Sequence, residues 1–281
     1  MFIYKLISKL PFNLLYYLSD FSAFILFRIA RYRRNISYQN IRNSFPDKTE
    51  QQIEYIQQVA YQHLADIMFE TIKAKTISNT EIASRVTLIG FEEIQHLVQN
   101  GDSVFMLTAH TAPVEWISFA AHLKYDFVID PVYKPIHSEK LDKFIFSMRS
   151  RHQSTPIPYK KLAKDIVLRK SAQRSIAMLA DLEPRSRDQS LNVDFLNQST
   201  RFFLGSEKII KLAGLPTFFI AIEKTTRGNY QATAIKLSLN PKKLDSNVLT
   251  KKYAKCVEEL VVKNPPYWLW THKRWKHRTS E

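Results

Sequence analysis

From residue 86 onward, short apolar runs rich in β-branched residues alternate with amphipathic segments. The runs include VTLI, SVFMLTA, DFVIDPVY, SIAMLA, PTFFIAI and QATAIKLSL, and the segments between them include 138–150, 160–170 and 205–213. Strands that alternate with helices pack as a sheet covered by helices. The pattern therefore predicts an α/β fold with a central, mostly buried mixed sheet flanked by helices.

Residues 1–34 differ from the rest of the chain, because they are apolar on nearly every side of a helix. Their length is about enough to cross a bilayer, which needs roughly 20 apolar residues. Asp20 near the middle makes a simple span costly, so the helix either spans the membrane or lies in its interface. A buried core helix is the alternative. The segment ends in a basic cluster, Arg28, Arg31, Arg33 and Arg34.

A basic cluster after a spanning helix places the downstream residues on the cytoplasmic side. Residues 35–80 have apolar residues on one helical face and are predicted to be helical. No linker or internal repeat is evident after them. We therefore expect a membrane-anchoring helix over 1–34 and a single domain over 35–281.

Charge favours anionic partners. The chain has 41 Lys and Arg against 26 Asp and Glu, a formal net charge of +15. Nucleic acid, acidic lipid headgroups and an acidic carrier protein would all fit that surplus. Nucleic acid is the weakest of the three, because no RNP, helix-turn-helix or zinc spacing is present. We predict an anionic membrane surface and no nucleic acid.

Cofactor motifs are missing from the sequence. It has no Gly-rich phosphate loop and no dinucleotide fingerprint, and no His, Cys or carboxylate cluster has metal-ligand spacing. The single cysteine, Cys256, excludes an internal disulfide. We therefore expect neither a cofactor nor a metal.

The stretch LTAHTAPVEW, residues 107–116, places His110 directly after an apolar run and Glu115 five residues later. His110 is expected at the carboxyl end of a strand, where open α/β sheets bind ligands. Thr111 can cap the next helix, so that Glu115 lies early in it and folds back toward the imidazole. A carboxylate on one ring nitrogen leaves the other basic, and such a pair can deprotonate a hydroxyl that attacks an acyl carbonyl.

The spacing alone is not specific. His137 and Asp142 repeat it in HSEKLD, among polar residues, and we interpret that pair as an exposed helix start. A structural role at a strand end is the alternative for His110. Asp181 also ends an apolar run, SIAMLAD, and is either part of the same site or a turn residue.

Further stretches, in order along the chain, complete a resemblance. The sequence resembles the lipid A biosynthesis acyltransferases of the lauroyl and myristoyl transferase type, within the lysophospholipid acyltransferase superfamily with its His-x4-Asp/Glu motif. The stretches are LTAHTAPVEW, PVYKP (131–135), LDKFIFSMRSRH (141–152), SIAMLAD (175–181), FLNQSTRFFLGSEKIIKLAGLPTFFI (195–220) and YWLWTHKRWK (267–276). The resemblance covers nearly the whole chain.

The resemblance implies an O-acyltransferase at the cytoplasmic face of the inner membrane. A fatty acyl group would pass from an acyl carrier protein or coenzyme A thioester, a co-substrate, to a hydroxyl of a lipid A precursor. It implies that His110 is the general base and Glu115 its partner. Lys134 stands where the family often has arginine, and either cation can hold a phosphate or stabilise an oxyanion.

Three further residues are candidate substrate-binding groups. Arg149 and Arg151 begin a run of basic residues that is either a solvated helix surface or a dock for carrier protein, headgroups or lipid phosphates. Asp181 is the third. The sequence departs from the family at 111–114, where an aromatic residue, Gly, Asn and Trp are common, and at Leu182, where Gln is common. A lysophospholipid or aminolipid acceptor, or a non-catalytic lipid-binding protein on this fold, therefore stays open.

Overall fold

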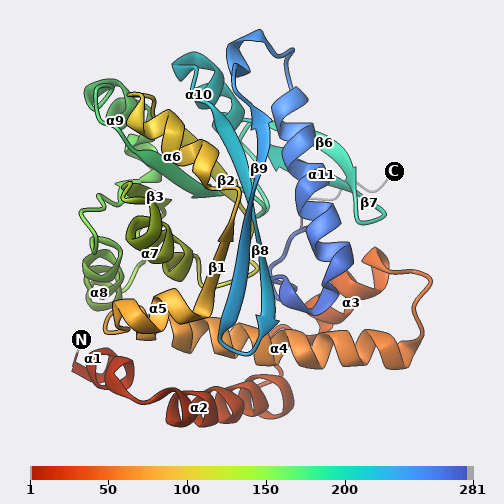
Figure 1. The fold of residues 1–281 in the computed structure, drawn as a ribbon. Coiled ribbons are helices and arrows are strands. Elements are labelled where there is room, and N and C mark those ends of the chain that lie inside the picture. The colour runs from red at the N-terminus through yellow and green to blue at the C-terminus, as the bar shows by residue number, and fades with distance from the viewer. Residues whose placement is uncertain (1, 277–281) are drawn as a thin grey trace.

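The centre of the protein is a seven-stranded mixed sheet in the order β1-β9-β8-β2-β5-β3-β4 (Figure 1). This computed structural model describes residues 2–276, so the end of the predicted 35–281 domain lies outside it. Strands β8 and β9 pair antiparallel, and the other neighbours pair parallel. The predicted α/β fold is confirmed. The strands are β1 Val86–Ile89, β2 Val104–Thr108, β3 Ile129–Tyr133, β4 Ile157–Pro158, β5 Ser175–Leu179, β8 Thr217–Thr226 and β9 Asn229–Ser238.

Helices cover both faces of this sheet. The segments predicted as helical over 138–150, 160–170 and 205–213 correspond to α8, α9 and α10. The helices are α1 Phe2–Lys9, α2 Phe12–Phe24, α3 Arg34–Ser44, α4 Glu50–Lys73, α5 Asn79–Arg85, α6 Glu92–Gln99, α7 Val114–Tyr125, α8 Glu139–Arg149, α9 Leu162–Leu168, α10 Gly205–Ala213 and α11 Val248–Lys263, with a π-helix over Ile25–Ile29 and 3-10 turns at Tyr159–Lys161, Pro241–Lys243 and Pro265–Tyr267.

The position of β2 in the middle of the sheet explains why its sequence is apolar throughout. Side chains alternate between the two faces of a strand. Phe105 and Leu107 pack into one buried cluster with residues of α4 and α11, whereas Val104 and Met106 pack into a second with residues of α7 and α8. Because both faces are covered, every residue of β2 is buried.

A separate two-stranded hairpin consists of β6 Ser190–Phe195 and β7 Gln198–Phe203. Its turn residues, Leu196 and Asn197, both have positive φ, 51° and 58°. Such turns match the twist of antiparallel strands. The backbone N–H of Leu196 donates to the Glu258 carboxylate of α11 at 2.6 Å, and this bond holds the leucine in its left-handed conformation. The sequence pattern did not predict this hairpin.

The N-terminal region is not the single long apolar helix expected over 1–34. It is divided into α1, α2 and the π-helix Ile25–Ile29, and it ends where Arg31 and Arg33 adopt positive φ. Within residues 2–276, no helix combines the length and the apolar character needed to cross a membrane.

Polar residues of α2 explain this arrangement. Ser19 donates to Asp66 of α4 at 2.7 Å, and the Tyr16 hydroxyl donates to Glu70 of α4 at 2.8 Å. Helix α2 therefore lies along α4, as Figure 1 shows. Asp20, the residue that makes a span costly, pairs with Arg227 of the β8–β9 turn, so it also holds α2 on the rest of the protein.

Candidate active site

His110 and Asp181 meet at one edge of the sheet. His110 follows β2 and Asp181 follows β5, and these strands are parallel neighbours. The carboxyl ends of parallel neighbours lie at the same edge, which is where such sheets bind ligands. The His110 Nδ1 atom lies 2.7 Å from Asp181 Oδ1. The backbone N–H of His110 donates to Asp181 Oδ2 at 3.0 Å. Of the two alternatives left open for Asp181, the structure shows the contact with His110.

The Asp181 carboxylate is fully buried, whereas the His110 side chain is 30% exposed. Burial by itself raises the pKa of Asp181, but the charge of His110, its two hydrogen bonds and one from Trp268 outweigh burial and lower that pKa to about 2. Asp181 is therefore ionised at neutral pH. It orients the imidazole with Nδ1 protonated, which leaves Nε2 free to accept a proton.

Glu115 does not contact the imidazole, contrary to the sequence-based prediction. Its Oε1 atom accepts two hydrogen bonds from Arg149, from Nε at 2.9 Å and from Nη2 at 2.8 Å. Thr111 does not cap helix α7 either, because its hydroxyl donates to the Ile222 carbonyl and α7 begins at Val114 after Pro113. The first turn of α7 therefore directs Glu115 to α8 and not back to His110.

Neither of the two other predicted substrate-binding cations is hydrogen-bonded to the His110–Asp181 pair within residues 2–276. Arg151 donates to the backbone carbonyls of Ala74 and Ile77 at 2.5 and 3.1 Å, so its guanidinium closes the turn after α4. Lys134 is exposed just after β3. His137 is exposed and precedes α8, as expected for a helix start. Of the predicted cations, Arg149 is therefore the one that pairs with the motif carboxylate.

Tyr253 of α11 holds the two strand ends together. Its hydroxyl donates to the Thr108 carbonyl at 2.9 Å and accepts from the Ala180 backbone N–H at 3.3 Å. These residues immediately precede the two segments that carry His110 and Asp181. Tyr253 is fully buried, and burial raises its pKa. It therefore fixes the spacing of the pair from outside the sheet.

A second histidine supports the loop after His110. His63 of α4 is buried, and its Nε2–H donates to the Thr111 carbonyl at 2.8 Å. Burial, with help from Lys224, lowers the pKa of His63 to about 3, so it is neutral. His63 lies far from His110 in the sequence, and no local motif indicated its role.

The C-terminal segment completes the site. Trp268 Nε1–H donates to Asp181 Oδ2 at 2.8 Å. From the 3-10 turn Pro265–Tyr267 to residue 276, where the described part of the chain ends, the segment contains no strand. The indoles of Trp268 and Trp270 are both buried. Sequence reasoning noticed this tryptophan-rich stretch but did not connect it with Asp181.

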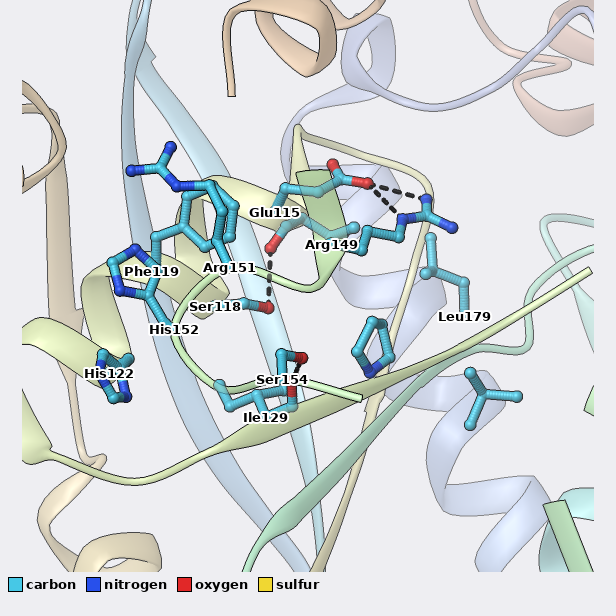
Figure 2. A pocket seen from close by; sticks show the side chains of 13 residues that line it. Glu115, Ser118, Phe119, His122, Ile129, Arg149, Arg151, His152, Ser154 and Leu179 are labelled. Carbon is cyan, nitrogen blue, oxygen red and sulfur yellow. Dashed lines mark hydrogen bonds and ion pairs between the residues drawn. The ribbon is translucent and has the colours of Figure 1, made fainter. Parts of the chain in front are cut away.

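A small cavity of about 30 Å³ adjoins the Glu115–Arg149 pair (Figure 2). Val114, Phe119, Val132 and Leu179 contribute apolar lining, while Ser118, His122 and His152 contribute polar atoms. The rings of His122 and His152 are 4.9 Å apart. Burial, with smaller contributions from Arg151 and His122, lowers the pKa of His152 to about 4, so the His152 ring is neutral at neutral pH.

A larger hollow lies at the opposite edge of the sheet, between α9 and α10. Ser103, Arg174 and Pro216, which line it, directly precede β2, β5 and β8. It therefore opens at the amino ends of these strands, away from His110. Within residues 2–276, no group of three or more His, Cys or acidic side chains is arranged to hold a metal ion.

The strand-end histidine with a buried carboxylate, on a sheet covered by helices, defines a site suited to general-base chemistry. The family model described as bacterial lipid A biosynthesis acyltransferase matches residues 1–277. The chain therefore belongs to this family and is an O-acyltransferase of lipid A biosynthesis. Comparison with curated proteins gave no match.

Proposed function

We propose that the protein transfers a fatty acyl chain from a thioester of acyl carrier protein or coenzyme A to a hydroxyl of a lipid A precursor, with His110 as the general base. The observation that carries this proposal is the pair in which His110 Nδ1 contacts the ionised, buried Asp181 while the ring stays partly exposed. Such a pair stabilises the imidazolium that forms once a proton has been taken.

The reaction needs no nucleophile from the protein. His110 Nε2 takes the proton of the acceptor hydroxyl, and the hydroxyl oxygen attacks the thioester carbonyl carbon. The tetrahedral intermediate then releases the thiolate, and the carbon–sulfur bond breaks. The imidazolium returns the proton to the sulfur, so the products are an ester and a free thiol.

Arg149 is our candidate for binding an anionic group of the substrate. Glu115 occupies its Nε and Nη2 atoms, and the side chain is 22% exposed beside the cavity. A guanidinium held in this way presents a fixed charge to a phosphate or to a developing oxyanion. The role of Glu115 in this scheme is to orient Arg149.

We also propose that the protein acts at an anionic membrane surface, with α2 lying flat in the interface. The buried residues of α2 are Leu15, Ser19 and Ala23. On the opposite side, an exposed stripe with helical spacing consists of Leu14, Tyr17, Phe21, Phe24 and Arg28. An exposed apolar stripe flanked by cations is typical of helices that bind bilayer surfaces. We propose that this surface is the cytoplasmic face of the inner membrane, as the resemblance to the family implies.

Label transfer tests the reaction. Membranes or purified protein would receive radiolabelled acyl carrier thioesters and a lipid A precursor, with His110→Ala in parallel. We expect transfer by the wild type and a loss of at least about a thousandfold in the variant. Undiminished transfer by His110→Ala would exclude His110 as the base. Lysophospholipid and aminolipid acceptors in further reactions would identify a different acceptor class.

Vesicle flotation tests the surface. Tyr17, Phe21 and Phe24 would be replaced together by serine, and the matched control would replace Tyr55 and Met68, which are exposed on α4. We expect the wild type and the control to float with anionic vesicles, less so at high salt. The triple variant should stay in solution. Equal flotation of both variants would contradict the role of α2.

A further inference from the structure

Three C-terminal tryptophans have buried or half-buried indoles, and each N–H has a different acceptor. Trp268 donates to Asp181 Oδ2 at 2.8 Å, Trp270 to the Pro265 carbonyl at 2.6 Å, and Trp275 to the Thr200 hydroxyl at 2.7 Å. The rings of Trp268 and Trp270 lie 4.8 Å apart, and those of Trp268 and Trp275 lie 6.1 Å apart. The three residues therefore share one aromatic cluster, but the N–H of Trp268 alone among them reaches the His110–Asp181 pair.

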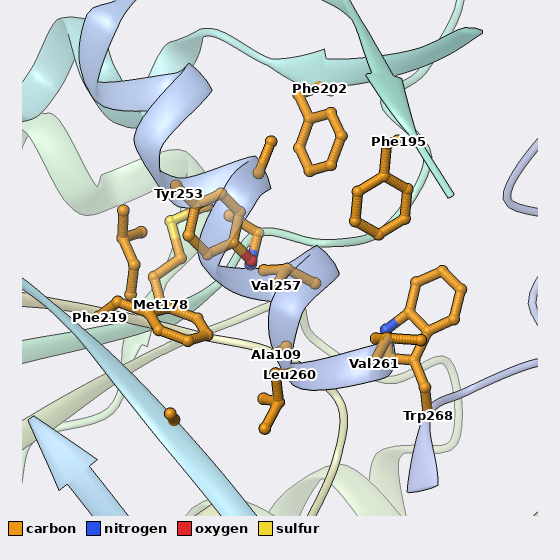
Figure 3. Packing of buried hydrophobic residues seen from close by; sticks show 14 of the residues in the cluster. Ala109, Met178, Phe195, Phe202, Phe219, Tyr253, Val257, Leu260, Val261 and Trp268 are labelled. Carbon is orange, nitrogen blue, oxygen red and sulfur yellow. The ribbon is translucent and has the colours of Figure 1, made fainter. Parts of the chain in front are cut away.

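The Trp268 indole is fixed by apolar packing. Figure 3 shows it beside Phe195 at the margin of the buried cluster that includes Tyr253 and Val261. The Phe195 and Trp268 rings are 5.8 Å apart, and Trp268 is 4% exposed. An indole packed in this way cannot turn its N–H elsewhere without opening the cluster.

The bonds to Asp181 show what this N–H does. Oδ1 faces His110 Nδ1, while Oδ2 accepts from the His110 backbone and from Trp268. The two donors on Oδ2 prevent the carboxylate from rotating away from the imidazole. They also compensate a charge that is fully buried.

We propose that Trp268 is a positioning residue of the acyl-transfer reaction, acting through Asp181 to keep His110 in the orientation and protonation state that the reaction needs. This inference rests on the proposed role of His110. It gives the C-terminal segment a function in the chemistry, besides its packing on β6 and β7.

Loss of this donor has an electrostatic signature. A carboxylate that accepts one hydrogen bond fewer is more basic and attracts the imidazolium more strongly. The acid limb of the pH–rate profile should therefore move to higher pH. The other charged or titratable groups around the pair are His272 and Arg274 of the C-terminal segment, Tyr253 of α11, and Arg33 before α3. All of them are kept when a single tryptophan is replaced.

The experiment compares Trp268→Phe with Trp270→Phe and Trp275→Phe in the full chain. Each variant removes one indole N–H from the same cluster, so the latter two control for packing and stability. We expect Trp268→Phe to lower kcat about ten- to hundredfold with little change in KM. Its acid limb should rise by about half a unit to one unit, and the controls should keep the wild-type limb. The same kcat and acid limb in all three variants would overturn the proposal.

Two measurements cover the remaining outcomes. NMR titration of ¹⁵N-labelled histidine gives the pKa of His110 without any substrate, so it separates failure of this inference from failure of the proposed reaction. If Trp268→Phe does not fold, 3-benzothienylalanine at position 268 preserves the ring shape and removes only the N–H. An unchanged His110 titration in that protein would exclude the positioning role.

Discussion

Two buried polar networks in this protein differ in whether one of their groups remains accessible to a substrate. At the carboxyl edge of the sheet, Asp181 is saturated by hydrogen bonds, but its partner His110 remains 30% exposed. Between α2, α4 and the β8–β9 hairpin, Asp66 accepts from Ser19, Lys224 and Arg227. We refer to this second network as the α2–α4 seam.

The seam also contains Glu70, whose carboxylate accepts from Tyr16 at 2.8 Å and from Tyr230 at 2.5 Å. Burial raises the pKa of Glu70, and the two tyrosine hydroxyls oppose that rise. Both seam carboxylates have their partners within the protein, so the network holds elements together. The strand-end pair differs because one ring nitrogen of His110 stays available. The contrast teaches that a buried carboxylate marks a catalytic site only when its hydrogen-bond partner is accessible to a substrate.

The largest expected effect tests which carboxylate serves His110. Asp181→Asn should lower kcat about 10³- to 10⁴-fold, because an amide favours the wrong imidazole tautomer. Glu115→Gln should cost far less, about tenfold, because Glu115 bonds Arg149. Steady-state kinetics of acyl transfer measure both. A larger loss in Glu115→Gln than in Asp181→Asn would reverse the assignment.

The seam should respond in stability and not in chemistry. Asp66→Asn leaves the cations Lys224 and Arg227 without their buried partner, so we expect a loss of about 3–5 kcal/mol in the free energy of unfolding. Denaturant titration measures this loss. Asp20→Asn is the control, because its exposed contact with Arg227 should contribute less than about 1 kcal/mol. A stable Asp66→Asn protein with a large kcat defect would break the distinction between the two networks.

Acid should weaken the strand-end pair. The pKa of Asp181 falls from an ordinary 3.8 to about 2 on folding. The ionised carboxylate therefore stabilises the folded state fully at any pH above about 4. That contribution, about 2 kcal/mol, should be lost as the pH falls from about 4 to about 2. Unfolding free energies at several pH values measure it, with Asp181→Asn as reference. Identical acid sensitivity in the variant would show that Asp181 contributes nothing to it.

The smallest expected effect concerns one tyrosine of the seam. Tyr230→Phe removes the hydroxyl that donates to Glu70 Oε2. We expect a destabilisation of about 1–2 kcal/mol, because a buried acceptor loses its partner. Thermal unfolding measures this change, and kcat should stay at the wild-type value. A clear loss of kcat in the folded Tyr230→Phe protein would connect the seam to the reaction.

The sequence predicted the layers of the fold well because its signals are local. Apolar runs such as SVFMLTA mark strands buried on both faces, and amphipathic segments mark the helices that cover them. His110 was predicted at a strand end for the same reason. The N-terminal helix was misjudged, because the sequence does not show that Tyr16, Ser19 and Asp20 bind elements far along the chain.

The sequence by itself determined the α/β class, the position of His110 after a buried strand and the resemblance to an acyltransferase family. Only the tertiary structure decided which carboxylate contacts His110. Spacing along one chain describes neighbours on a helix, and it favoured Glu115. Asp181 lies 71 residues further along, and it reaches His110 because β2 and β5 are parallel neighbours with their carboxyl ends at one edge. Strand order depends on how the whole core packs, and no local spacing records it.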